Sequence, residues 1–104
     1  MRESRLTISD AAAADIVEQA DWYEEQSGAE LTRRWGKAVT SAVLRIIDYP
    51  RAGAISKFQH SELSNVRRVL IPGFPKHLIF YQLRKSEILI LRIVHGARDL
   101  ESLF

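Results

Sequence analysis

Apolar residues recur every three or four positions through the first half of the chain, which predicts two amphipathic helices. The first apolar stripe consists of Ala12, Ile16, Ala20 and Tyr23. Ser9 or Asp10 supplies its N-cap, and "QSG" at 26–28 ends it, with Gly28 as a left-handed cap. The second stripe consists of Leu31, Trp35, Ala38, Ala42, Ile46 and Tyr49, and Pro50 stops it. The two predicted helices are joined only by the short break at 26–28, which predicts an antiparallel helical hairpin.

Strand-like runs occupy the start and the second half of the chain. They cover residues 5–9, 66–71, 76–83 and 87–94. "PGFP" at 72–75 predicts a type II turn centred on Pro72 and Gly73. Residues 52–65 show no period and are expected to form a loop. The order β-α-α-β-β-β predicts one α+β domain over 1–104: the hairpin packs on one face of a mainly antiparallel four-stranded sheet, and a short C-terminal tail follows.

Charge is distributed unevenly along the chain. Residues 1–30 contain eight acids and two arginines, a net charge of −6, whereas the remainder contains thirteen Lys/Arg and five acids, a net charge of +8. The sum is the overall charge of +2. The basic last two-thirds of the chain is therefore expected to attract acidic proteins or nucleic acid.

Several classes of site find no support in the composition. The chain has no cysteine, and no two of its histidines, His60, His77 and His95, have the i,i+4 spacing of a helical metal site. No glycine-rich phosphate loop is present. We therefore expect no metal and no cofactor. The start "MRESRLTISD" lacks an apolar signal segment, and no apolar run approaches membrane-spanning length, so we expect a cytoplasmic protein with no membrane partner.

The basic residues near the strand ends allow two interpretations. Arg67 and Arg68 lie on opposite faces of one strand, and alternation places His95 on the same face as Leu89, Leu91 and Ile93. Metal-free RNA cleavage needs a base, an acid and cations at the phosphate, and Arg67, Arg68, His95 and Arg98 could supply them. Alternatively, His95 and Arg98 organise the tail. Arg92 is expected to be partly buried and tied to a carboxylate or to main-chain carbonyls.

Six segments together resemble one protein family. They are "ISDAAAADI", "WYEEQSG", "IIDYPRAG", "VRRVLIPGF", "LIFYQL" and "ILRIVHGARD". Their order and spacing resemble the RelE/ParE superfamily of bacterial toxins. The ending "HGARDLESLF" is more similar to ParE-like members, because it contains no Tyr, and Phe104 cannot transfer a proton.

The resemblance implies a toxin of a type II toxin–antitoxin pair, associated with plasmid stabilisation. It would inhibit DNA gyrase, have no catalytic residues and form a hetero-oligomer with a cognate antitoxin. One alternative is a RelE-like ribosome-dependent mRNA endonuclease that uses Arg67, Arg68, His95 and Arg98. Another alternative is a non-toxic protein of the same fold that only binds its antitoxin.

The same resemblance, with the charge and aromatic distribution, implies two sets of contact residues. The candidates for binding the target are Arg98, Leu100, Leu103 and Phe104. The candidates for binding the antitoxin are Trp22, Tyr23, Arg33, Arg34, Lys37, Arg67, Arg68 and Tyr81.

Overall fold

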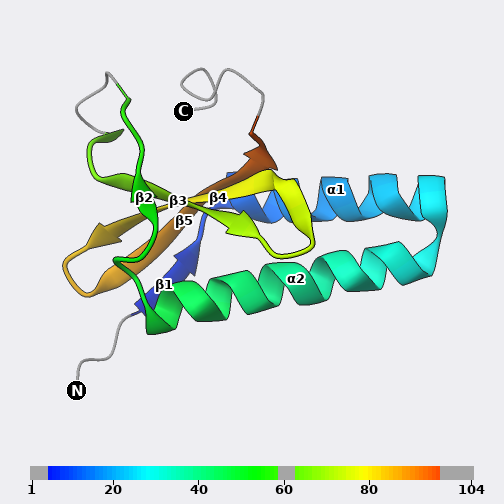
Figure 1. The fold of residues 1–104 in the computed structure, drawn as a ribbon, viewed down its shortest axis with the longest axis horizontal. Coiled ribbons are helices and arrows are strands. Elements are labelled where there is room, and N and C mark those ends of the chain that lie inside the picture. The colour runs from blue at the N-terminus through cyan, green and yellow to red at the C-terminus, as the bar shows by residue number, and fades with distance from the viewer. Residues whose placement is uncertain (1–4, 59–62, 97–104) are drawn as a thin grey trace.

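The computed structural model describes residues 5–58 and 63–96 and shows an α+β fold (Figure 1). Its elements are β1 (Arg5–Ile8), α1 (Asp10–Ser27), α2 (Ala29–Asp48), β2 (Ala54–Ile55), β3 (Val66–Ile71), β4 (Phe74–Arg84) and β5 (Glu87–His95). The sheet order is β1-β5-β4-β3-β2, and only the β1–β5 pair is parallel. The predicted fold class and element order are confirmed, with one strand added.

The added strand is β2, which lies in the segment expected to be a loop. It pairs Ala54 with Arg68 and Ile55 with Arg67, and the Ser56 N–H extends the pairing by donating to the Val66 carbonyl at 2.7 Å. Two residues are too few to show a period in sequence. β2 forms because the main-chain groups along the edge of β3 can pair with it.

The helical hairpin forms where the capping residues predict it. The Ser9 hydroxyl accepts from the Ala12 N–H at 3.0 Å and donates to the Leu91 carbonyl at 2.8 Å, so one side chain both starts α1 and joins it to β5. Gly28, at φ 86°, ends α1 by donating its N–H to the Glu24 carbonyl, and α2 follows at once. The predicted caps are therefore confirmed.

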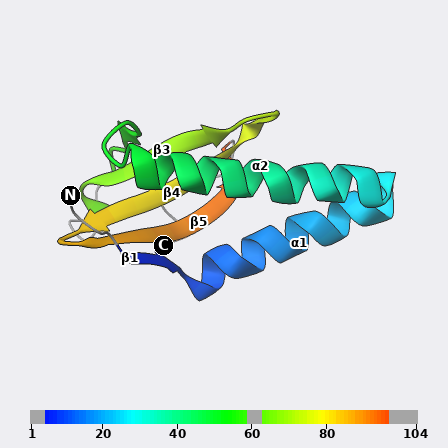
Figure 2. The same cartoon turned by 90° about the horizontal axis from the view of Figure 1, so that it is seen from below.

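The main core lies between the hairpin and one face of the sheet. Figures 1 and 2 show the hairpin along that face, with its turn projecting beyond the strands. Trp35 is fully buried, its ring centroid is 5.2 Å from that of Phe74 and 5.8 Å from that of Tyr23, and its Nε1 donates to the Ile16 carbonyl. A smaller cluster, Val66, Phe80 and Val94, lies apart from this core. No helix in the described ranges is long and apolar enough to span a membrane.

A β-bulge in β5 changes which residues face the helices. Phe80 pairs with Arg92 but Tyr81 pairs with Ile90, so Leu91 is an extra residue. The side chains of β5 that enter the core beneath the helices are consequently Ile88, Ile90 and Ile93. Their spacing in the sequence is two residues and then three. The predicted grouping of His95 and Ile93 with Leu89 and Leu91 is therefore wrong, because strict alternation assumed an uninterrupted strand.

Candidate functional site

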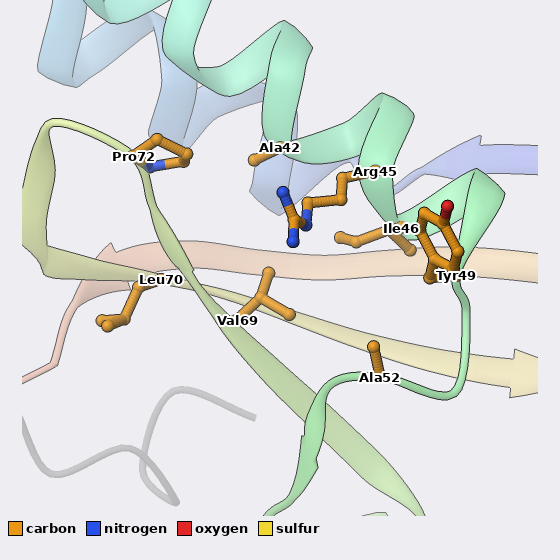
Figure 3. Close-up of a pocket in the computed structure, with 8 residues that line it drawn as sticks. All are labelled: Ala42, Arg45, Ile46, Tyr49, Ala52, Val69, Leu70 and Pro72. Atoms are coloured by element: carbon orange, nitrogen blue, oxygen red, sulfur yellow. The ribbon is translucent and has the colours of Figure 1, made fainter.

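An apolar groove lies between the C-terminal half of α2 and strand β3 (Figure 3). It has a volume of about 250 Å³, and its lining residues are Ala42, Arg45, Ile46, Tyr49, Ala52, Val69, Leu70 and Pro72. Figure 3 shows Arg45 reaching from α2 into the space beside β3, while Val69 and Leu70 point to opposite sides of the strand. Tyr49 and Leu70 are 64% and 58% exposed, so two large side chains of the groove are open to solvent.

The loop that closes one end of the groove is held by Tyr81. This side chain is fully buried, and its hydroxyl donates to the Pro50 carbonyl at 2.8 Å and accepts from the Gly53 N–H at 3.1 Å. A Cβ at Gly53 would come within 2.4 Å of that hydroxyl, so the contact needs glycine. Burial raises the pKa of Tyr81. Tyr81 was predicted to contact the antitoxin; in this structure its side chain is part of the core and its hydroxyl holds the loop.

The edge of β3 beside the groove has an unpaired stretch. Main-chain groups along a strand alternate in direction, and the Val66 carbonyl points to β2 because it accepts from Ser56. Arg68 and Leu70 therefore point the same way. Arg68 lies opposite Ala54, but Leu70 lies beyond the end of β2. Within residues 5–58 and 63–96, nothing pairs with the outward N–H and C=O of Leu70.

The surroundings of the groove are basic. Residues 45–76 contain six Lys/Arg and two acids, a net charge of +4. The Arg67 guanidinium donates to the carbonyls of Arg51 at 2.9 Å and Gly53 at 2.8 Å, so this arginine braces the loop. Arg68 donates to the Ser56 hydroxyl at 3.1 Å. These contacts go to neutral acceptors, so both arginines keep their positive charge uncompensated in the described part of the chain.

A second, more polar cavity lies between α1 and the ends of β4 and β5. His77 and His95 face each other across the two strands with ring centroids 5.6 Å apart, and His77 lies 5.1 Å from Trp35. Burial, with a smaller effect of His95, lowers the pKa of His77. Trp22 lines this cavity and is 54% exposed, whereas Tyr23 is buried, which raises the pKa of its phenol.

Asp15 joins α1 to the free edge of β5. Its carboxylate accepts from Arg92 Nε and Nη2, both at 2.8 Å, and from the Ile93 N–H at 2.9 Å. The hydrogen bond to Asp15 raises the pKa of the Arg92 guanidinium. The expected pairing of Arg92 with a carboxylate is confirmed.

Comparison with known proteins identifies the family. Residues 6–100 match the family model described as "ParE toxin of type II toxin-antitoxin system, parDE". The chain belongs to the ParE toxin family. Its fold is similar to a chain of the solved structure "Chromosomal ParDE TA system from P. aeruginosa", with a TM-score of 0.73 and 22% identity over 88% of this chain and 95% of that one. At that identity the likeness shows a shared fold. No curated protein sequence gives a significant match.

Two of the alternative nuclease residues, Arg68 and His95, lie apart in the structure, and a third, Arg98, lies outside the described residues. Arg68 lies opposite Phe80, whereas His95 lies opposite His77, three positions along β4, a separation of about 10 Å. The rings of His77 and His95 lie with Trp35 on the helix side, whereas Phe80 belongs to the separate cluster. The guanidinium of Arg67 braces the loop. No group of three or more potential metal ligands occurs among the described residues.

The other predicted contact residues fall into two groups. Arg33, Arg34 and Lys37 are exposed on α2 but do not line the groove, and Arg33 pairs with Glu30. The target-binding candidates Arg98, Leu100, Leu103 and Phe104 lie outside the described residues. The groove residues themselves were not among the predictions. The available signal was "VLI" at 69–71, since three successive apolar residues in a strand must place one side chain on the outer side.

Proposed function

We propose that this ParE-family chain is the toxin of a cytoplasmic toxin–antitoxin pair and that its cognate antitoxin neutralises it by covering the groove between α2 and β3. The match to the ParE toxin model over residues 6–100 carries the proposal. The groove supports it, because it combines exposed apolar side chains with a basic rim, a surface suited to an acidic amphipathic segment.

We further propose DNA gyrase as the target. The ParE-like ending of the sequence favours this target over the ribosome. The separation of Arg68 from His95, on different sides of the sheet, also disfavours a nuclease site, because acid–base catalysis needs its groups within hydrogen-bonding reach of one substrate.

Induction of the chain in bacterial cells tests this proposal, with DNA breaks and mRNA cleavage measured in the same cultures. Gyrase poisoning predicts double-strand breaks with intact mRNA, and rescue when the antitoxin gene is co-expressed. Cuts in mRNA at ribosomal A sites without DNA breaks would instead identify a nuclease. Normal growth at verified expression, with antitoxin binding retained, would identify a non-toxic antitoxin-binding protein.

A further inference from the structure

We propose that His77 and His95 form a binding site for a divalent metal ion such as Zn²⁺, which would join strand β4 to the end of β5. This inference is independent of the proposed function and concerns the second cavity, beside α1. It follows from the register of the two strands, from the distance between the two imidazole rings and from the residues that hold one of them in place.

The strand register brings the two side chains together. His77 and His95 are direct partners in the antiparallel pairing of β4 with β5. The Gly96 N–H donates to the Lys76 carbonyl at 2.8 Å, so the two histidines occupy a non-hydrogen-bonded position of the ladder. At such positions the Cα atoms are only about 4.5 Å apart, and both side chains leave the sheet on the same face. Both imidazoles therefore line one cavity with residues of α1.

The separation of the rings suits one shared ion. Their centroids are 5.6 Å apart, and their planes are inclined by 76°. Two imidazoles bound to one zinc ion at a tetrahedral angle, with Zn–N bonds of about 2.1 Å, have ring centroids roughly 5 Å apart. The observed separation is close to this value, so a small side-chain rotation is enough for both rings to reach the ion.

Packing fixes one ligand and leaves the other adjustable. The centroid of the His77 ring lies 5.1 Å from that of Trp35 and 6.4 Å from that of Phe74. His95, the last residue of β5, is exposed and has room to turn toward the ion. Each imidazole needs only one nitrogen for the metal, because the other nitrogen commonly makes the hydrogen bond that orients the ring. The pair is thus a partly preorganised two-ligand site.

The ligand type selects the class of ion. Imidazole nitrogen suits Zn²⁺, Cu²⁺ and Ni²⁺, whereas Mg²⁺ and Ca²⁺ prefer oxygen ligands. Glu18 lines the same cavity, and its negative charge favours a cation there. No third potential ligand groups with the pair within residues 5–58 and 63–96. Water would therefore complete the coordination, and we expect an exchangeable ion rather than one that the fold requires.

Titration of the unmodified chain with zinc chloride tests the site, with the imidazole signals followed by NMR. We expect one zinc ion per chain, and the ring signals of His77 and His95 should change together. Magnesium chloride at the same concentrations should leave both signals unchanged. Unaltered signals of the pair at zinc concentrations up to about 1 mM, or changes confined to His60, would overturn the proposal.

Substitutions identify the ligands. His95→Gln removes the exposed ligand and should weaken zinc binding at least about tenfold in calorimetric titrations. His60→Gln, the same change at the remaining histidine, is the matched control and should alter the affinity by less than about twofold. Zinc should also raise the melting temperature of the unmodified chain but not that of His95→Gln. Equal zinc affinities of His95→Gln and the control would overturn the assignment.

His77→Gln should cause the same loss of zinc binding as His95→Gln. Because His77 packs against Trp35, circular dichroism must first show that this variant is folded. Sedimentation then distinguishes a site within one chain from an ion held between two copies. We expect an unchanged sedimentation coefficient when zinc is added, whereas zinc-dependent association would overturn the site within one chain. None of these measurements involves an antitoxin or a toxicity assay, so they fail or succeed separately from the proposed function.

Discussion

Replacing Tyr81 with Phe removes one hydroxyl that organises the wall of the groove. The hydroxyl donates to Pro50 and accepts from the buried Gly53 N–H, so the substitution leaves a buried donor and a partly buried acceptor without partners. An unsatisfied buried group costs about 1–3 kcal/mol, and a further net hydrogen bond about 0.5–1.5 kcal/mol. We expect the free energy of unfolding to fall by about 2–4 kcal/mol.

Urea unfolding of the two proteins measures this difference directly. For a domain of this size, a loss of 2–4 kcal/mol would lower the melting temperature by roughly 8–25 °C. The matched control is Tyr49→Phe, which deletes the same atom from a side chain that is 64% exposed and should change stability by less than about 0.5 kcal/mol. If Tyr81→Phe proved as stable as the control, the hydroxyl would not hold the loop.

Two further predictions concern α1 and the histidine pair. Asp15→Asn should lower the free energy of unfolding by about 2–3 kcal/mol, because it weakens charged hydrogen bonds with Arg92. In urea titrations, a loss no greater than that of Asp21→Asn, the same change at an exposed position of α1, would contradict this. For His77, a lowered pKa in the fold means that the unfolded state binds the proton more readily. Stability should therefore decline as pH falls below about 6.5, the unfolded pKa, and His77→Phe should flatten that decline; an unchanged pH profile would refute it.

Much of the architecture could be predicted because the residues that mark the ends of its elements lie next to those elements in the sequence. Ser9, Gly28 and Pro50 mark the ends of two helices, and the structure places those ends where the caps indicate. The strand-like run at 66–71 likewise coincides with β3 (Val66–Ile71).

The errors arose where a distant segment decides the local structure. The extra residue Leu91 depends on pairing with β4, so β5 alone carries no sign of it. Tyr81 was named as an antitoxin contact, but its hydroxyl bonds to a loop 28 positions earlier, at Gly53, which the strand alone does not reveal. The groove forms only where α2 packs beside β3, so no single segment of the sequence could predict it.

A gyrase assay with purified components tests the central claim most directly. Relaxed plasmid, DNA gyrase and ATP are incubated with the unmodified chain, and the DNA is analysed after denaturation of gyrase. We expect linear, gyrase-bound DNA that increases with toxin concentration and disappears when cognate antitoxin is added first. Undiminished supercoiling without cleaved DNA, at toxin concentrations that saturate the antitoxin, would contradict it.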